Sequence, residues 1–459
     1  MSLALGPAGA TASASETFTM RLDRLPLNSF HWRLLVVSGI GWLFDAMDVI
    51  LISFLLVPIG REFALDATRT GLVASAGFVG MFFGAAIAGR LADRYGRRVV
   101  FSSTLVLFSV GAVLSAAAPT FETLLLARAV AGLGLGGELP VAATLVSEFS
   151  PRAQRGRMIV LLESFWAYGT LTAGLIAIFV VPAYGWRWAF AVGALPALYA
   201  AYLRGALPES PRYLAERGRA AEADAVVRRV ERAGGAALLT LAKAVAPMRV
   251  GRSRIADLFR PEYRRRTAML WILWFGIVFT YYGIFLYVPT LLVARGLSEV
   301  RSNEFFFLST IAQVPGYFSA AWLVERWGRK PTLVTYLLGS AACALLFGNS
   351  GTGTDAFVYA ALLSFFNLGA WGIVYSVSPE LYPTAIRATG VGVAASVGRI
   401  GGIIGPFLTP VLVPAIGQTG VFVMFMALLV LTALTVYTLA EETKGRSLEE
   451  ISTAGPVAA

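Results

Sequence analysis

A charged ten-residue stretch, Gly89-Arg-Leu-Ala-Asp-Arg-Tyr-Gly-Arg-Arg98, recurs later in the chain as Ala321-Trp-Leu-Val-Glu-Arg-Trp-Gly-Arg-Lys330. The two copies are offset by 232 residues. Glu148-Phe-Ser-Pro-Arg-Ala-Gln-Arg155 recurs at the same offset as Glu380-Leu-Tyr-Pro-Thr-Ala-Ile-Arg387. Because both signatures repeat at one spacing and in one order, the chain is predicted to contain two halves with the same orientation.

The sequence between these signatures is apolar, with 57% hydrophobic residues, 14% charged residues and a mean hydropathy of +0.70. A bilayer core requires about 20 apolar residues per helix. Twelve spans are expected, at 31–58, 68–90, 98–118, 121–147, 157–182, 186–205, 267–293, 302–325, 331–349, 355–378, 386–415 and 419–440. The long spans 31–58 and 386–415 are expected to be tilted or bent. The predicted fold class is an all-α membrane protein with twelve helices in two pseudo-symmetric halves.

The spans divide the chain into five regions. These are a disordered tail at 1–29, a six-helix bundle at 30–205, a linker with short helices at 206–266, a second bundle at 267–440 and a tail at 441–459. A third pair of related segments, Pro208–Arg212 and Ala440–Lys444, follows the two bundles at the same offset of 232.

Basic residues are distributed unequally between the two sides of the membrane. Thirty-one Lys and Arg residues fall on the side that holds both termini and the linker, and five fall on the other side. Positive loops stay in the cytoplasm, so both termini are predicted to be cytoplasmic in the plasma (inner) membrane. The net charge of +11 is then expected to meet anionic lipid rather than nucleic acid.

One cysteine and one histidine exclude an internal disulfide and offer no cluster for a metal. No cofactor is expected, and the protein is expected to act as a monomer.

Ionisable side chains inside predicted spans are candidates for function, because each costs at least about 2.5 kcal/mol to insert. They are Asp45, Asp48, Arg128, Glu138, Glu163 and Arg399. Asp45 and Asp48 share one helix face, and two neighbouring carboxylates in a low dielectric are not both easily ionised. Arg128 lies at a depth similar to that of Asp48, so protonation of Asp48 is expected to release Arg128 or change its partner. We expect this trio to couple proton uptake to rearrangement, with a static ion pair as the alternative.

Arg399 lies among small residues of its span, in Ser396-Val-Gly-Arg-Ile-Gly-Gly402, without an acid on the same helix. Its guanidinium suits a carboxylate in a bidentate arrangement, so it is predicted to bind an anionic substrate. The alternative is a pair with an acid on another helix, such as Asp45 or Asp48. Glu163 is a weaker candidate for the substrate site, and Glu138 is expected either to act directly or to bond to nearby backbone.

Aromatic side chains near the centres of spans are unusual, because interfacial belts place Trp and Tyr at helix ends. Aromatic walls with a few polar groups suit a planar organic ligand, although ordinary packing is an equally good explanation for any single ring. The predicted ligand-contacting set is Trp166, Trp274, Tyr281, Tyr282, Gln313, Tyr317, Trp371 and Tyr375.

The repeated loop charges are expected to act at the cytoplasmic gate rather than on the substrate. At helix ends they can form ion pairs that break when the gate opens; the alternative is a solvated loop. They are Asp93, Arg94, Arg97, Glu148, Arg155, Glu325, Arg326, Arg329, Glu380 and Arg387.

Gly89–Arg98 resembles the signature loop of the major facilitator superfamily, and Arg128-Ala-Val-Ala-Gly-Leu-Gly-Leu-Gly-Gly137 resembles its fourth-helix motif. Pro208–Arg212 and Glu442-Thr-Lys-Gly445 are similar to signatures of sugar porters and organic-ion transporters. The resemblance covers 30–450 and implies a carrier that works by alternating access.

Gly41-Trp-Leu-Phe-Asp-Ala-Met-Asp-Val49 looks like the first-helix motif of proton-coupled aromatic-acid symporters and niacin transporters. It departs from the aromatic-acid pattern at Ala46-Met47, where that family prefers Gly-Tyr. Gly136-Gly-Glu-Leu-Pro140 also brings it nearer the niacin and organic-ion branch. The segment around Arg399 resembles the eleventh helix of organic-ion transporters, where a basic residue implies an anionic substrate.

Together these features predict a proton-coupled symporter that imports a small organic anion, an aromatic carboxylate such as nicotinate. The alternatives are an organic-cation or sugar carrier of the same fold, or a ligand sensor that does not transport. An enzyme is not expected, because the sequence offers no nucleophile–base pair, and the Gly132–Gly137 run follows no strand.

Overall fold

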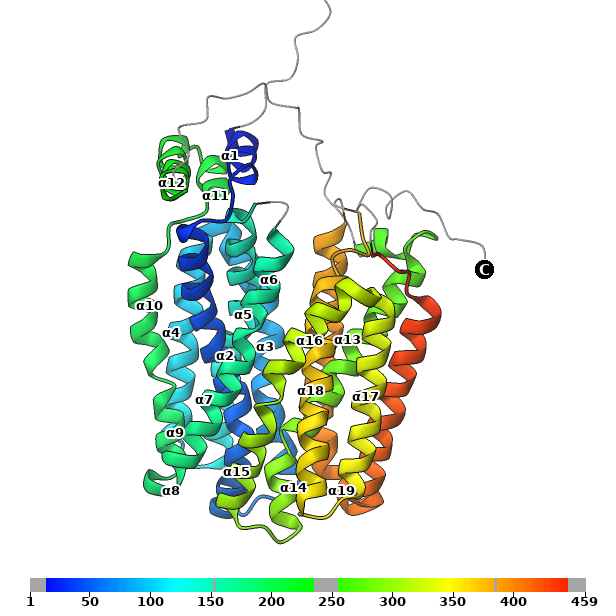
Figure 1. The fold of residues 1–459 in the computed structure, drawn as a ribbon. Helices are drawn as coiled ribbons and strands as arrows, with labels where there is room; N and C mark the ends of the chain where they lie inside the picture. The colour runs from blue at the N-terminus through cyan, green and yellow to red at the C-terminus, as the bar shows by residue number, and fades with distance from the viewer. Residues whose placement is uncertain (1–13, 152–153, 235–254, 384–385, 445–459) are drawn as a thin grey trace, which may run out of the picture.

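The computed structural model describes residues 14–151, 154–234, 255–383 and 386–444, and within these the chain forms helices and no strand (Figure 1). Nine helical stretches of the described chain are long and apolar enough to cross a membrane, and one of them, Arg155–Tyr184, is a run of three consecutive helices. Two further spans consist of consecutive shorter helices, and the last long helix contains two spans. The expected twelve spans are therefore present.

The first half contains six spans. They are α2 (Ser29–Glu62), α3 (Ala67–Tyr95), α4 (Arg97–Ala116), α5 (Phe121–Phe149), the series α6 (Arg155–Glu163), α7 (Phe165–Phe179) and α8 (Val181–Tyr184), and the series α9 (Trp186–Val192) and α10 (Leu195–Ala206).

The second half repeats this order. Its elements are α13 (Arg264–Phe285) with α14 (Val288–Ala294), α15 (Glu299–Thr310) with α16 (Gln313–Trp327), α17 (Arg329–Asn349), α18 (Thr354–Val377) and α19 (Arg387–Leu439). Gly417, with a φ of 70°, divides α19 into the last two spans.

Helices of one half pack on those of the other along the middle of the molecule (Figure 1): α3 on α19, α7 on α15 and α2 on α14. Arg61 at the end of α2 also forms an ion pair of 2.8 Å with Glu299 at the start of α15. The interface between the halves thus includes a charged contact at the end of the bundle opposite α1, α11 and α12.

Close helix approach in the first half depends on the glycine run of α5. A Cβ on Gly132 would collide with the carbonyl oxygen of Gly77, and a Cβ on Gly136 would collide with that of Met81. Without Cβ atoms, the α3 and α5 backbones touch at these points. This contact fixes how α5 presents its ionisable residues to α2.

The extramembrane segments differ in part from expectation. Part of the predicted disordered tail is helix α1 (Ala14–Asp23), because Arg21 binds Asp224 and Glu231 of the linker. Residues 1–13 of the tail and most of the 441–459 tail lie outside the described residues. The linker contains the predicted short helices α11 (Pro211–Glu216), α12 (Ala220–Ala233) and the 3₁₀ helix Ile255–Phe259. In Figure 1 α1, α11 and α12 lie together beyond one end of the bundle.

Candidate functional site

Arg128 of α5 and Asp48 of α2 form a bidentate ion pair inside the first half. The guanidinium donates to both carboxylate oxygens, at 3.0 Å and 2.6 Å. Both side chains are buried, and the guanidinium lies over the ring of Phe190, 5.1 Å from its centroid. These two predicted residues are therefore in contact, and both carboxylate oxygens of Asp48 accept hydrogen bonds from Arg128.

Asp45 lies one turn from Asp48 on the same face of α2 but has a different environment. Its side chain is fully buried, and neither carboxylate oxygen has a hydrogen-bond partner among the described residues. Asp45 is not paired with Arg128, because the guanidinium is engaged by both oxygens of Asp48. The role of these three residues in proton coupling stays a prediction.

Arg399 projects from α19 toward the first half. Its guanidinium donates to the carbonyl oxygen of Gly136 on α5, at 3.3 Å. Within the described parts of the chain no carboxylate forms an ion pair with it, although Asp45, Tyr282 and Tyr375 lie within electrostatic range. The anticipated alternative, a fixed pair with Asp45 or Asp48, is absent from the described structure. Arg399 thus presents a cation, without a matching acid, at the junction of the two halves.

Aromatic residues of both halves meet beside this cation. The Trp166 indole of α7 donates a hydrogen bond of 2.8 Å to the Tyr281 hydroxyl of α13. Tyr282 packs on Phe78 of α3 with ring centroids 4.4 Å apart. These contacts cross the interface between the halves, so both halves contribute to one aromatic lining.

The second half completes the lining with α18. Trp371 stacks on Tyr375 at 5.8 Å, and both rings meet Trp274 edge to face. Tyr281 also approaches Trp371, at 5.8 Å. Trp274 and Tyr281 therefore present one face of α13 to α18, as their seven-residue spacing predicts.

Two buried amides lie on neighbouring helices of the second half. Gln313 of α16 and Asn367 of α18 are completely buried, and no amide atom of either has a hydrogen-bond partner in the described structure. Buried polar groups are normally satisfied, so these amides are suited to a polar ligand or water. Tyr317, one turn from Gln313, packs against Gly372.

Glu163 ends α6 immediately before the helix break at Ser164 and is 2% exposed. It lies within electrostatic range of Asp45, Tyr317 and Tyr375. A carboxylate contributed by the first half therefore faces the tyrosines of the second.

One residue of this region, Trp42, was not predicted, and another, Glu138, was named as a candidate acid but was not placed in the predicted site. Trp42 packs at a tilt on Trp166, with ring centroids 5.3 Å apart, and lies beside Glu163. Glu138 is buried without a described partner for either oxygen. The sequence contained an indication of both residues. Trp42 lies three residues before Asp45 and so shares its helix face, and Glu138 is an acidic residue inside an apolar span.

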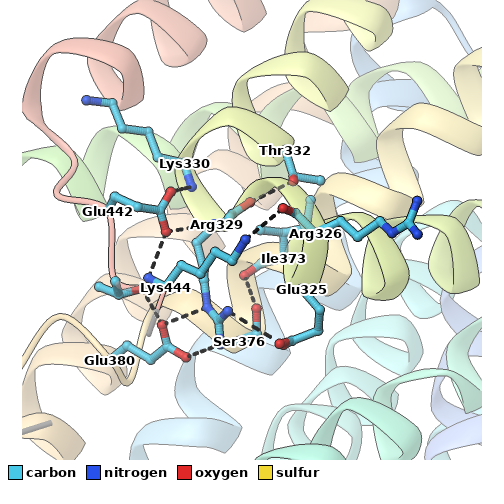
Figure 2. Close-up of polar contacts among 12 residues, drawn as sticks. Glu325, Arg326, Arg329, Lys330, Thr332, Ile373, Ser376, Glu380, Glu442 and Lys444 are labelled. Atoms are coloured by element: carbon cyan, nitrogen blue, oxygen red, sulfur yellow. Dashed lines mark hydrogen bonds and ion pairs between the residues drawn. The ribbon is translucent and has the colours of Figure 1, made fainter. Parts of the chain in front are cut away.

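The repeated loop charges form equivalent ion pairs in the two halves. Arg97 lies 3.4 Å from Glu148, and Arg329, at the corresponding position, lies 3.3 Å from Glu380. Figure 2 shows Arg329 between Glu380 and Glu325. Each pair lies within one half, so it directly fixes the end of that half, and a gating role for it stays a prediction.

A second acid caps the helix that follows each signature. Glu209 accepts from the backbone nitrogens of Arg97 and Arg98, and Glu442 accepts from those of Arg329 and Lys330 (Figure 2). The expected offset of 232 would instead align Glu209 with Glu441. That alignment is wrong by one residue at this pair, because Glu441 is engaged by Arg266.

The other predicted gating residues have varied surroundings. Arg155 binds Asp23 of α1 at 2.9 Å, Arg387 donates to the carbonyl oxygen of Tyr382, and Arg94 and Arg326 cover the rings of Tyr95 and Trp322. The side chain of Asp93 lies outside the described residues.

The sequence is similar to that of known membrane transporters. The model of the family described as "Sugar (and other) transporter" matches residues 35–454. A niacin transporter of Acinetobacter baylyi is 46% identical over 94% of this chain and 98% of its own length. A putative niacin/nicotinamide transporter of Bacillus subtilis is 44% identical over 91% of this chain and 98% of its own length.

The fold matches that of the Escherichia coli xylose transporter in a partially occluded inward-open conformation. The TM-score is 0.76 at 19% identity, with 91% of this chain and all of the solved chain covered. The family match and the named relatives define the protein as a multi-pass membrane transporter and not an enzyme. The chain belongs to the sugar (and other) transporter family of the major facilitator superfamily.

Proposed function

We propose that this transporter is a proton-coupled symporter that imports a small aromatic monocarboxylate, nicotinate, by alternating access. The observation that carries the proposal is Arg399, a cation at the junction of the halves with no described acid to neutralise it. The name of the Acinetobacter relative points to niacin, and the name of the Bacillus relative includes niacin together with nicotinamide, which has no carboxylate.

In this proposal the substrate carboxylate binds the Arg399 guanidinium bidentately. The planar ring lies among Trp166, Tyr281, Tyr282 and Trp371, whose contacts already link both halves. Gln313 has free donor and acceptor atoms for the ring nitrogen. A site made from both halves can be exposed to either side as the halves rock.

A proton carries the coupling. Of the two aspartates of α2, Asp45 can accept a proton without breaking an ion pair, whereas Asp48 is held by Arg128. One proton moving with one monoanion transfers no net charge, so the pH gradient would drive accumulation and the membrane potential would not. The protein is proposed to work as a monomer in the inner membrane, with both termini in the cytoplasm.

Uptake of labelled nicotinate into proteoliposomes tests this proposal. We expect nicotinate and benzoate to compete, and nicotinamide, glucose and a quaternary amine to compete far less, because only the first two bring a carboxylate to Arg399. Arg399→Gln should cost about 2–5 kcal/mol of binding, which is roughly 30-fold or more in affinity. Arg301→Gln, at an exposed arginine of α15, is the control.

Nicotinamide and nicotinate taken up equally well, or unaltered nicotinate uptake by Arg399→Gln, would overturn the anion site. Wild-type uptake that does not respond to an acid exterior would overturn proton coupling.

A further inference from the structure

Asp45 on α2 and Glu138 on α5 are two carboxyl groups with the same unusual surroundings. Both are fully buried, and none of their four oxygens has a hydrogen-bond partner among the described residues. One turn from Asp45 on α2, Asp48 forms an ion pair with Arg128 of α5. Among the described residues, no basic side chain of α5 pairs with Asp45 or Glu138.

The absence of a side chain at Gly41 leaves room on α2 for the Glu138 carboxyl group. A Cβ on Gly41 would lie 2.7 Å from Glu138 Oε1, so the glutamate carboxyl rests directly on the glycine. Gly41 and Asp45 are four residues apart and therefore lie one above the other on the same helix face. Glu138 thus reaches the surface of α2 one turn from Asp45.

The charged and titratable groups around this pair come from several elements. Asp45 faces Glu138 of α5, Asp48 of its own helix, Glu163 of α6 and Arg399 of α19, and Tyr282 of α13 is near. Tyr199 of α10 lies near Glu138. Three acids and one guanidinium surround Asp45, and Asp48 is neutralised by Arg128.

An ionised carboxylate buried without a partner is strongly disfavoured. Two such carboxylates within electrostatic range of each other cannot both be ionised easily. The pair is therefore suited to hold at least one proton, whereas Asp48, which accepts two charge-assisted hydrogen bonds, is suited to remain ionised.

We propose that Asp45 and Glu138 together form the proton-binding site of symport, and that Asp48 with Arg128 is a fixed structural pair. This inference rests on the proposed proton coupling and adds Glu138 to it. A proton passes from external water to a carboxylate oxygen of the pair and is released from that oxygen to the cytoplasm. No other bond forms or breaks.

Arg399 links this proton to the substrate. With the site empty, its positive potential favours an ionised Asp45. A substrate carboxylate bound to Arg399 cancels that potential, so the carboxyl pair takes up a proton. Linkage is reciprocal: protonation of the pair leaves Arg399 free to hold the substrate more tightly.

The experiment compares two assays in proteoliposomes for wild type, Asp45→Asn and Glu138→Gln. The first is nicotinate accumulation driven by an acid exterior at zero membrane potential. The second is counterflow, in which labelled nicotinate exchanges with unlabelled nicotinate and no gradient is needed. Glu122→Gln, at an exposed position on the same helix as Glu138, is the matched control.

Wild type and Glu122→Gln should accumulate nicotinate about tenfold per pH unit, the limit for one coupled proton. Each pair variant should show an accumulation ratio near one while counterflow persists at a reduced rate. Accumulation by both pair variants equal to that of wild type would overturn the inference and leave the symporter intact. Absence of accumulation in wild type itself would instead reject the proposed coupling.

The number of protons taken up when nicotinate binds gives a second measurement, which also serves for a variant that no longer exchanges nicotinate in the counterflow assay. Nicotinate binding in detergent is followed by calorimetry in two buffers with different ionisation enthalpies, which yields the protons bound per nicotinate. The expected value is near one for wild type and clearly lower for either variant. A variant that binds nicotinate with the wild-type proton count would contradict the role of that residue.

Discussion

Arg128 and Asp48 bind each other through two hydrogen bonds in the buried centre of the first half, with 2.6 Å between Nη2 and Oδ2. The pair joins α5 to α2 about one turn from Asp45, which has no described partner. Of two acids three residues apart, one is therefore neutralised by a fixed cation and the other is not.

Removing one member of this pair should destabilise the protein strongly. Asp48→Asn leaves Arg128 buried without its counter-ion, which costs about 3–5 kcal/mol. We expect a lower melting temperature in detergent for Asp48→Asn, and partial recovery in the double variant Asp48→Asn, Arg128→Gln, in which both charges are gone. A stable Asp48→Asn protein that has lost only its response to a pH gradient would show instead that Asp48 carries the proton.

The hydrogen bond between Trp166 and Tyr281 should favour the conformation in which the two halves meet at this point. Tyr281→Phe removes the hydroxyl and keeps the ring contacts with Tyr282 and Trp371. Loss of this hydrogen bond should destabilise that conformation by about 1 kcal/mol, which changes the ratio of the two conformations about fivefold. The measurement is the KM for nicotinate from the two membrane faces, in right-side-out and inside-out vesicles. Tyr336→Phe, which removes the hydroxyl that contacts Ser319 within one half, should not alter their ratio.

The glycines that start α4 and α17 should be equally intolerant of a side chain. Gly96 has a φ of 102° and Gly328 a φ of 103°, and a Cβ on either would collide with the capping carboxylate, Glu209 or Glu442. Replacement by alanine should cost about 1–2 kcal/mol for the backbone alone and more because the cap is displaced. Gly185 is the control, since its φ is 86° but open space surrounds it. Melting temperatures in detergent should fall further for Gly96→Ala and Gly328→Ala than for Gly185→Ala.

Docking of α1 on α12 should weaken in acid. The hydrogen bond from Arg21 holds the pKa of Asp224 below its usual value. A lowered pKa in the folded state means that this stabilisation is complete above the ordinary aspartate pKa of about 4, and is lost as the pH falls through the folded-state pKa. Hydrogen exchange of α1 should therefore rise below that range, and Arg21→Ala should raise it at neutral pH. Arg219→Ala, which breaks the exposed pair with Glu222, should leave α1 protected.

The residues of the candidate site were predictable as a set, but their partners were not. Arg399 stands out because it is a cation inside an apolar span, and Trp274 and Tyr281 because they share a face at the centre of another. Hydropathy gives the depth of a residue only approximately and says nothing of the rotation of one helix against the next. Similar depth placed Arg128 beside Asp48, but it could not show that Asp45 has no described partner or that Glu138 rests on Gly41.

The amino-acid sequence by itself determined the twelve apolar spans, the two repeated halves and which charges had to be accommodated among them. These properties are local, since about 20 apolar residues in a row cross a bilayer whatever surrounds them. Only the tertiary structure decided which charges are neutralised, because α2, α5 and α19 are far apart in sequence and meet through the contacts of their glycines and rings. Asp48 thereby obtains Arg128 as its partner, while Arg399, Asp45 and Glu138 form no ion pair among the described residues.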